Sequence, residues 1–379
     1  MYKFVGGADQ KVFARSENMK KLLIGGLGEG YGGVSNVIMT YLRNVDRSQF
    51  NISVIETYDS VYHDEIVSLG FEIIRLPVFK KYFKYKKAVR KLFKDRKFDV
   101  VWINNTAKVD ILLMKYAKCS GAKVITHSHG TVQEGSRLKR CVFEFINKLH
   151  EKKFYSYMDL GVACSQSSAT YFYNAKYLKN KEVFVLPNAI DCKKYEYSCE
   201  KRIAAREILN ARDADIVLAC IGRVCDVKNL DFALKIMPLL PDKYKLVIIG
   251  GGDARTLQAE VARTGLDNRV SFLGARSDVD LLMNGVDMLL LPSLSEGLPM
   301  IVLEAQANGV KCIISDRVSS ECKVLESAEF ATICDESVWA DIIKRAETER
   351  TENAATILTE GGFDVATYSQ KLSEWINHV

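Results

Sequence analysis

The sequence predicts an α/β protein made of two doubly wound parallel sheets that face a central cleft. Short runs rich in valine, isoleucine and leucine alternate with amphipathic stretches, the pattern of buried parallel strands connected by helices. This pattern occurs on both sides of a turn signal at residues 187–191. The length of 379 residues is also sufficient for two domains that each bury a core.

The strand candidates form two groups. In the first half they are residues 21–25, 52–56, 72–76, 100–103, 123–127, 160–163 and 183–186, with helices expected at 34–44, 64–69 and 109–118. In the second half they are residues 216–221, 245–249, 270–272, 288–291 and 311–314. Ligands of open parallel sheets bind at the carboxyl ends of the strands. We therefore expect the functional residues in the loops that follow these strands.

These groups define the expected domains. Residues 1–18 are interpreted as an extension, 19–190 as a first Rossmann-like domain and 191–362 as a second. Residues 363–379 form a helix that either closes the second domain or crosses back to the first. The extension lacks the apolar segment of a secretory signal, and the sequence has no apolar run long enough to span a membrane. The ten cysteines form no Cys-x-x-Cys pair, which favours buried thiols in a reducing cytoplasm.

The charge is divided unevenly between the halves. Residues 1–190 contain 31 Lys/Arg and 17 Asp/Glu, a net +14, whereas residues 191–379 contain 22 and 30, a net −8. Much of the excess lies between Lys80 and Lys97, with ten basic residues and one acid. We expect an anionic partner for the first half: a membrane, a nucleic acid or a phosphorylated ligand.

The most informative segment runs from residue 289 to residue 305. An apolar strand enters a polar loop at Ser295 and Glu296, and Gly297-Leu298-Pro299-Met300 then opens a helix that contains Glu304. The free N–H groups of such a helix end attract a phosphate, and glycine allows close approach to a ligand. Glu304 lies between apolar neighbours, and a carboxylate there can accept two hydrogen bonds from a vicinal diol such as a ribose.

A second group directly follows the strand at 216–221. Gly222-Arg223 and Lys228 place an arginine and a lysine in one loop, where together they can bind a diphosphate. The alternative is a solvated loop with two surface cations. Gly251, within Gly250-Gly251-Gly252-Asp253 after the next strand, lies near a base or ribose or is part of a tight turn.

The first strand is followed by a glycine-rich loop that opens a helix. Gly28, Gly30 and Gly33 satisfy the dinucleotide-binding fingerprint, but the acid expected at the end of the next strand is at best Glu56. A backbone that approaches a phosphate or sugar explains the loop equally well.

Three further motifs carry alternatives. One or both of His127 and His129, which follow a strand, are interpreted as lining the cleft. Neither Cys119 nor Cys141 has convincing spacing for a zinc site with them. Asp278-Val279-Asp280 matches the Asp-x-Asp of metal-dependent sugar transferases, but helix capping is the better interpretation. A basic segment interleaved with aromatics suits an anionic membrane surface, single-stranded nucleic acid or a solvated helix; its cations are Lys80, Lys81, Lys84, Lys86, Lys87, Arg90 and Lys91.

In combination, these residues resemble the retaining glycosyltransferases of family four, which have two Rossmann-like domains in the arrangement called GT-B. The resemblance covers nearly the whole chain from Met19. Glu296 and Glu304 match the Glu-x7-Glu signature, and residues 187–191 match the interdomain segment. Gly222-Arg223 with Lys228-Asn229 match the diphosphate clamp, Tyr31-Gly32-Gly33-Val34 match the first glycine loop, and His127 matches the histidine beside the donor sugar.

The resemblance implies a role for each residue. Arg223 and Lys228 bind the donor diphosphate in place of a metal ion, with help from the backbone of residues 297–300. Glu304 holds the ribose, and Glu296 orients the transferred sugar. His127, with His129 as an additional candidate, contacts that sugar from the first domain. The acceptor proton passes to the departing phosphate without a protein nucleophile, no cofactor or metal is required, and the final helix crosses back.

The His-Ser-His-Gly and Tyr-Gly-Gly-Val motifs most resemble bacterial polysaccharide-assembly enzymes. That resemblance implies transfer of a hexose or N-acetylhexosamine from a UDP-sugar to a polyprenyl-diphosphate-linked saccharide, in capsule, exopolysaccharide or O-antigen assembly. It implies a cytoplasmic protein, peripheral on the inner membrane face, without a nucleic-acid partner. The alternatives are a nucleotide-sugar epimerase or dehydrogenase, or a non-catalytic saccharide- or nucleic-acid-binding protein.

Overall fold

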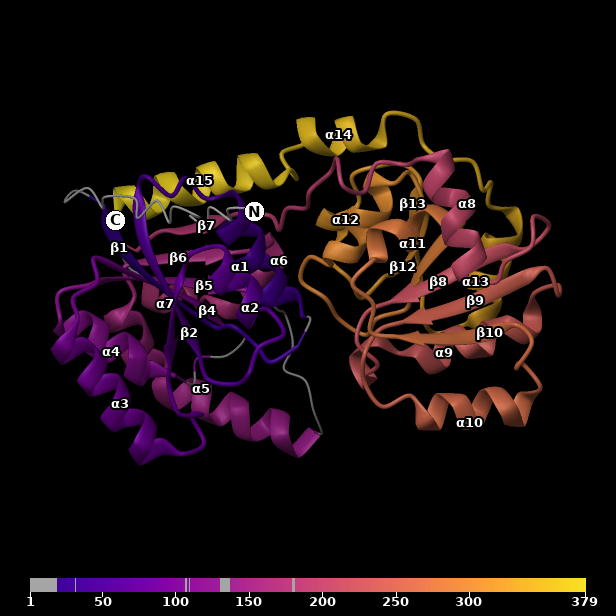
Figure 1. The fold of residues 1–379 in the computed structure, drawn as a ribbon. Helices are drawn as coiled ribbons and strands as arrows, with labels where there is room; N and C mark the ends of the chain where they lie inside the picture. Colours follow the sequence, from indigo (N-terminus) through magenta and orange to yellow (C-terminus); the bar gives the residue numbers. More distant parts are fainter. Residues whose placement is uncertain (1–18, 31, 106–107, 109, 130–136, 179–180) are drawn as a thin grey trace, which may run out of the picture.

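A computed structural model describes residues 19–30, 32–105, 108, 110–129, 137–178 and 181–379. The predicted extension at 1–18 and Tyr31 lie outside these residues. Two parallel sheets with helices on both faces stand side by side, which confirms the predicted fold class (Figure 1). Every strand pairing in both sheets is parallel.

The first domain has a seven-stranded sheet in the order β3-β2-β1-β4-β5-β6-β7. Its strands are β1 (Lys20–Gly25), β2 (Phe50–Glu56), β3 (Glu72–Arg75), β4 (Val100–Asn105), β5 (Lys123–Ser128), β6 (Leu160–Ala163) and β7 (Val183–Val185). Its helices are α1 (Gly33–Asn44), α2 (His63–Ser68), α3 (Tyr82–Asp95), α4 (Ile111–Cys119), α5 (Arg137–Tyr157), α6 (Gln166–Phe172) and α7 (Ala175–Leu178).

The second domain has a six-stranded sheet in the order β10-β9-β8-β11-β12-β13. Its strands are β8 (Ile216–Ile221), β9 (Tyr244–Ile249), β10 (Val270–Gly274), β11 (Met288–Leu291), β12 (Lys311–Ser315) and β13 (Ala328–Ala331). The helices that follow the first domain are α8 (Cys199–Ile208), α9 (Leu230–Ile236), α10 (Arg255–Thr264), α11 (Val279–Gly285), α12 (Met300–Ala307), α13 (Glu336–Arg345), α14 (Ala354–Glu360) and α15 (Val365–His378).

The twelve predicted strands are confirmed, with ends that differ by at most two residues, and β13 was missed. β13 is an edge strand with the sequence Ala-Glu-Phe-Ala, in which only the two alanines are buried. Glu329 in its centre pairs with Lys311 on β12. A strand at the edge of a sheet has a neighbouring strand on one side only. It therefore does not need the continuous apolar run by which the central strands were recognised.

The central strands bury both of their faces in separate cores. On β8, Val217, Ala219 and Ile221 join one core while Leu218 and Cys220 join the other. This period of two places α12 and α14 on one face of the second sheet and α9, α10 and α13 on the opposite face. In the first domain, α1 and α15 cover one face, and α3, α4 and α5 cover the other.

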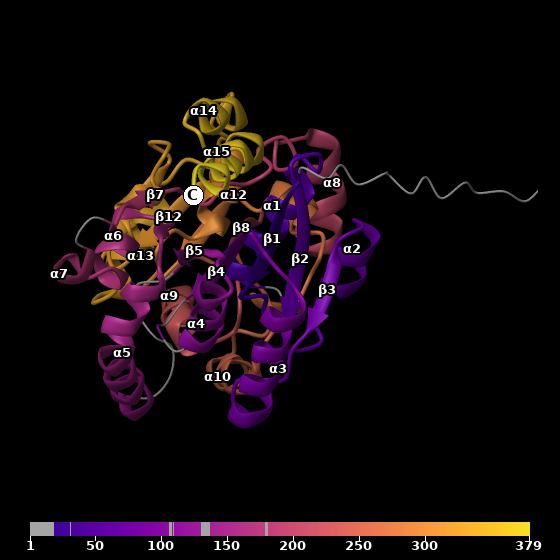
Figure 2. The same cartoon turned by 90° about the vertical axis from the view of Figure 1, so that its left-hand side faces the viewer.

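Helix α15, at the end of the chain, lies on the first domain. Its partner segment is the interdomain linker, because Ile190 N donates to Phe363 O at 2.9 Å and Val365 N to Ile190 O at 3.1 Å. Along α15, Tyr368, Leu372 and Ile376 are buried in the core shared with α1. Both views show the yellow helix running across the first domain (Figures 1 and 2). The two domains are therefore joined by two adjacent crossings of the chain.

In the part of the chain that the structure describes, no helix is long and apolar enough to cross a bilayer. The cysteines described there are free thiols, and five of them are buried.

We predict that Leu372→Ala lowers the free energy of unfolding of the first domain by about 2–5 kcal/mol, since it removes a fully buried side chain from the α1–α15 core. Chemical denaturation followed by tryptophan fluorescence measures the change. Lys371→Ala, on the exposed side of the same helix, is the control. Equal unfolding midpoints for both variants would contradict the packing described for α15.

Candidate functional site

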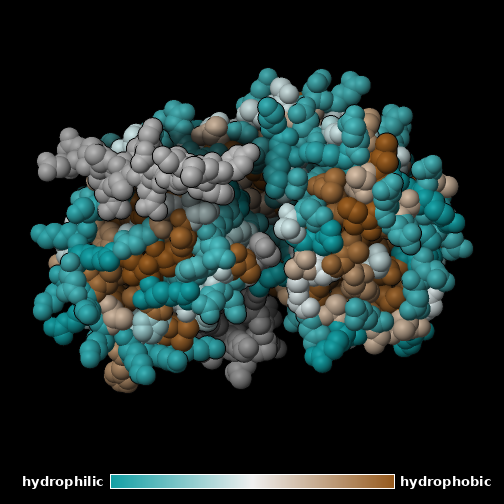
Figure 3. Space-filling view, viewed as in Figure 1, coloured by the Kyte–Doolittle hydropathy of each residue, from teal (hydrophilic) through white to brown (hydrophobic). Residues whose placement is uncertain are grey.

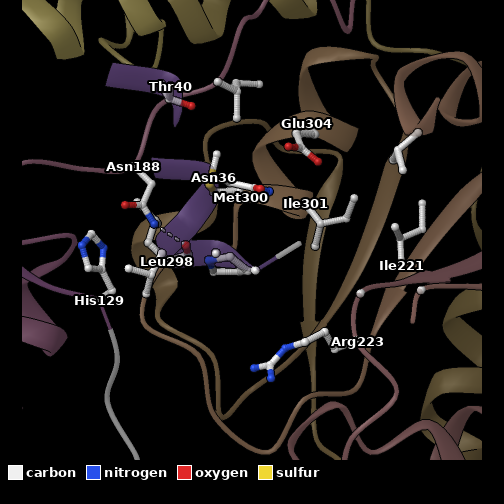
Figure 4. A pocket seen from close by; sticks show the side chains of 18 of the residues that line it. Asn36, Thr40, His129, Asn188, Ile221, Arg223, Leu298, Met300, Ile301 and Glu304 are labelled. Carbon is white, nitrogen blue, oxygen red and sulfur yellow. Dashed lines mark hydrogen bonds between the residues drawn. The ribbon is translucent and has the colours of Figure 1, made fainter. Parts of the chain in front are cut away.

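A cavity of about 970 Å³ lies between the two domains. A furrow between the two halves of the molecule is visible on the surface (Figure 3), and residues from both sides project into the cavity (Figure 4). The predicted site residues that line it are Gly32, Gly33, His129, Gly222, Arg223, Lys228, Gly251, Ser295, Glu296, Gly297, Leu298, Pro299, Met300 and Glu304. The structure thus brings together residues that are up to 272 positions apart in the sequence.

The loops after β8 and β11 form one wall of the cavity. β8 and β11 are adjacent parallel strands, so their carboxyl ends lie at the same edge of the sheet. Leu294 N donates to Val227 O at 2.8 Å, and Asn229 Nδ2 donates to Pro292 O at 3.1 Å. These bonds fix the two loops to each other. The predicted clamp and the predicted glutamate signature therefore belong to one hydrogen-bonded unit.

Within this unit a lysine and a glutamate are paired. Lys228 Nζ lies 2.6 Å from Glu296 Oε1, and Ser293 Oγ donates to the same oxygen at 2.6 Å. Both charged side chains are largely buried, with 18% and 17% exposed. The pairing places the positive charge of Lys228 at the cavity wall, in the same loop as Arg223.

Glycines allow the loops after β8 and β9 to touch. A Cβ on Gly250 would lie 1.8 Å from the carbonyl oxygen of Gly222, which no side chain tolerates. Gly222 itself has φ +146°, and the stem of Lys228 lies 3.0 Å from the position its Cβ would take. Gly251 then exposes backbone to the cavity. These glycines are required by close approach rather than by flexibility.

The start of α12 is tied to the interdomain linker. Pro299 is the N-cap residue of α12, with no side-chain hydrogen bond to the first turn. Asn188 Nδ2 from the linker donates to Leu298 O at 3.0 Å, the bond drawn in Figure 4. The N-terminus of α12, whose N–H groups carry partial positive charge, thereby faces the cavity that Met300 and Ile301 line.

Glu304 follows on the same helix and lies at the opposite side of the cavity from Arg223 (Figure 4). Burial raises the pKa of the Glu304 carboxyl to about 7, against the opposing effects of a hydrogen bond from Tyr195 and the charge of Lys194. Tyr195 is held by its backbone, since Asn308 Nδ2 donates to Tyr195 O at 2.7 Å. Tyr195 was not recognised from the sequence, because it lies outside every strand-end motif.

The two predicted histidines have different positions. His129 lines the cavity, and its Nε2 lies 2.7 Å from Asn104 Oδ1. His127 is fully buried behind it, with ring centroids 4.0 Å from His129 and 5.9 Å from Trp102. Only His129 of the two therefore lines the cavity, and the position of His127 contradicts the contact with the donor sugar that the resemblance implied for it. Residue 127 is the next to last of β5, where its side chain points into the sheet's core rather than to the strand end.

Asn104 determines which ring nitrogen of His129 carries the proton. Its amide Nδ2 donates to Gly25 O at 3.2 Å, which leaves Oδ1 as the acceptor toward His129. His129 Nε2 must then carry the proton, and Nδ1 is an acceptor. Burial lowers the pKa of His129 to about 3, so the ring is neutral. Asn104, at the end of β4, is a second functional candidate that the sequence motifs did not single out.

The first domain contributes a polar wall from α1 and α2. Arg43 forms a bidentate pair with Glu65 at 2.6 and 2.9 Å, and Tyr62 Oη donates to Asn36 Oδ1 at 2.5 Å. Thr40 lies on the same helix as Asn36 (Figure 4). All five residues line the cavity. Their spacing on α1 follows the helical period, but nothing in the sequence distinguished them from an ordinary polar helix face.

The geometry disfavours a dinucleotide site at the first glycine loop. Glu56, the only candidate acid at the end of β2, is buried and accepts bonds from Ser60 N and His63 Nδ1, both at 2.9 Å. It does not line the cavity. Gly32 is instead the N-cap residue of α1, so the loop presents helix backbone to the cavity.

The Asp-x-Asp motif begins a helix, as predicted, but the Asp278 side chain makes no capping hydrogen bond. Asp278 is the N-cap residue of α11, and its carboxylate pairs with Arg276 at 2.6 Å. Asp280 pairs with Lys194 at 3.3 Å. In the described residues, no group of three or more His, Cys, Asp or Glu side chains is placed to hold a metal ion.

Comparison with known proteins places both domains in known families. Residues 31–194 match the family described as Glycosyltransferase Family 4, and residues 201–357 match Glycosyl transferases group 1. A Bacillus subtilis protein named as a glycosyltransferase, EpsF, is 26% identical over 84% of this chain and 85% of its own length.

An Escherichia coli protein is 26% identical over 77% of this chain and 78% of its own; its name is UDP-Gal:alpha-D-GlcNAc-diphosphoundecaprenol alpha-1,3-galactosyltransferase. Among solved structures, Anabaena HepE in complex with UDP and glucose superposes with a TM-score of 0.79. That comparison has 19% identity and covers 95% of this chain and all of HepE. The chain belongs to the glycosyltransferases of family 4 and has the GT-B fold.

Proposed function

We propose that this glycosyltransferase moves a hexose or N-acetylhexosamine from a UDP-sugar to a lipid-linked saccharide, with retention of configuration. The observation that carries the proposal is that the second domain lines the cavity with two cations, a helix N-terminus and a half-buried carboxylate, with the carboxylate on the side opposite Arg223. The two cations and the helix N-terminus suit the diphosphate, and the carboxylate suits the ribose that is attached to one end of that diphosphate. The Escherichia coli relative, by its name, uses UDP-Gal and a diphosphoundecaprenol-linked acceptor, and HepE was solved with UDP and glucose.

In this proposal the second domain holds the donor. Arg223 and Lys228 bind the diphosphate and stabilise the charge that develops on the leaving group, without a metal ion. Glu304 accepts the ribose hydroxyls, and Glu296 orients the transferred sugar. His129, rather than His127, contacts that sugar from the first domain, since His129 is the histidine that lines the cavity.

The acceptor enters from the first domain. Front-face attack passes the acceptor proton to the departing phosphate oxygen, so no protein nucleophile takes part. Closure of the two domains excludes water from the cavity before transfer. The linker and α15 cross side by side next to the cavity, which suits them to act as the hinge.

We further propose that the protein works at the inner face of the cell membrane, in polysaccharide assembly. The face of α3 that meets the core is apolar, with Tyr85, Val89, Leu92 and Phe93 buried. All seven cations predicted for the membrane surface are exposed, and none has an ion-pair partner in the described residues. Phe83 is 84% exposed beside them. An exposed aromatic among unpaired cations suits an anionic lipid surface.

Helix α5 supports this surface with a second patch. Phe145 and Leu149, one turn apart, are each 62% exposed. Lys148, Lys152 and Lys153 are exposed around them. Helix α4 packs against both α3 and α5, so the two patches lie on the same covering layer of the first sheet. Figures 1 and 2 both show α3 and α5 at the lower edge of the molecule.

We predict that Glu304→Ala and Lys228→Ala each abolish sugar transfer while the protein stays folded, since each removes one anchor of the donor. A panel of nucleotide sugars, read out by released nucleotide, first identifies the donor and then measures turnover. Thermal unfolding confirms the fold, and Lys235→Ala on the exposed side of α9 is the control. Near-normal turnover in either site variant would refute the donor site.

We predict that the affinity for the intact donor increases about tenfold from pH 6 to pH 8, because the ribose binds the ionised form of Glu304, whose pKa is about 7 without donor. Lys194, Asp280 and Tyr195 are the other titratable groups that act on this carboxyl. Isothermal titration at the two pH values tests the prediction. A dissociation constant that is equal at both values, or a Glu304→Gln variant with the same pH dependence, would contradict it.

We predict that replacing Lys80, Lys81, Lys84, Lys86, Lys87, Arg90 and Lys91 by glutamine abolishes flotation with anionic vesicles, because the electrostatic attraction is lost. Vesicles of neutral phosphatidylcholine are the control. Unchanged flotation of the variant with anionic vesicles would exclude this surface as the membrane contact.

A further inference from the structure

Without a donor, the lysine proposed to bind its diphosphate is bound by Glu296. From this pair we propose a selection mechanism, which rests on the proposed function. Glu296 makes the cavity discriminate against the free nucleoside diphosphate and in favour of the nucleotide sugar. The Lys228–Glu296 pair thereby promotes release of the diphosphate product as well as binding of the donor.

The pair cannot separate by movement of the loops alone. Lys228 is the last residue of the short 3₁₀ turn Asp226–Lys228, whose Val227 O accepts from Leu294 N. Glu296 is anchored on its other side, because it forms a β-bridge with Val318. Both residues are therefore held at fixed backbone positions. Exchange of partners has to occur through the side chains.

A phosphate that binds Lys228 must either break the ion pair between the Lys228 ammonium and Glu296 or share the ammonium with Glu296. Glu296 then keeps the hydroxyl of Ser293, 2.6 Å from Oε1, but loses its countercharge while remaining largely buried. A buried carboxylate without a countercharge is unfavourable unless other donors replace it. The consequence of phosphate binding thus depends on what else the ligand brings to Glu296.

A nucleotide sugar brings hydroxyl groups next to its second phosphate. These can donate to the carboxylate of Glu296 while Lys228 moves to the phosphate, so both charges remain satisfied. A nucleoside diphosphate brings no such donors. Its terminal phosphate also carries additional negative charge near neutral pH, since the ester bond to the sugar is absent. It therefore places a second anion beside Glu296, in competition for the same lysine.

The same electrostatics act after transfer. Once the sugar has left and the terminal phosphate has released to solvent the proton that it took from the acceptor, the diphosphate carries additional negative charge and Glu296 has lost its hydroxyl donors. Re-formation of the Lys228–Glu296 pair then displaces the product. The Lys228–Glu296 pair therefore favours binding of the nucleotide sugar and release of the nucleoside diphosphate.

Titration calorimetry with the full-length chain tests this mechanism, using UDP against UDP-glucose and GDP against GDP-mannose as probes. Glu296→Gln is expected to bind the nucleoside diphosphate about tenfold more tightly than the wild type, because the competing charge is gone. It is expected to bind the nucleotide sugar no more tightly. Glu296→Ala serves as a second variant, Ser293→Ala as the matched control that keeps both charges, and thermal unfolding monitors the fold.

The outcomes separate two claims. If the wild type binds a nucleotide pair and Glu296→Gln changes both affinities by the same factor, or leaves the diphosphate affinity unchanged, the selection mechanism is overturned and the donor site stands. If the wild type binds no probe of either pair, the proposed function fails and the mechanism fails with it.

Discussion

The parallel pairing of β8 with β11 is the constraint on which the site depends. Because Met288 lies opposite Leu218 and Leu289 opposite Ala219, the two strands end at the same edge of the sheet. Their loops meet there and are fixed by the bonds from Leu294 to Val227 and from Asn229 to Pro292. The cationic clamp, the glutamates and the start of α12 become neighbours as a result. A change of register between these strands would separate all of them.

The second constraint is the join between the domains. Asn188 connects the linker to the backbone of the Glu296 loop through Leu298. Glu321, on the turn Ser320–Cys322, accepts from Gln166 N at 2.9 Å at the start of α6 in the first domain. Ser319, next to that turn, is joined to Glu296 through its backbone N–H. The loop that carries Glu296 is thus bonded to elements that contact the first domain on two sides, so domain position and donor contacts are mechanically linked.

Most of the fold and of the donor wall could be predicted from the sequence, because buried parallel strands produce short apolar runs and ligand loops follow them directly. Gly222, Arg223, Lys228, Glu296 and Glu304 line the cavity as expected. What failed has a physical reason. His127 and His129 differ by two positions on one strand and its loop, and only the end of β5 decides which one reaches the cavity. Tyr195, Asn104 and Arg43 owe their positions to tertiary contacts, which leave no local pattern.

The central claim is that this cavity binds a nucleotide sugar through the second domain. A crystal structure of the chain with the nucleotide identified by the donor panel tests it most directly. We expect the diphosphate on Arg223 and Lys228, the ribose on Glu304, and Glu296 turned from Lys228 toward the sugar. A nucleotide bound at the first glycine loop beside β2, or a diphosphate that leaves the Lys228–Glu296 pair intact, would contradict the account.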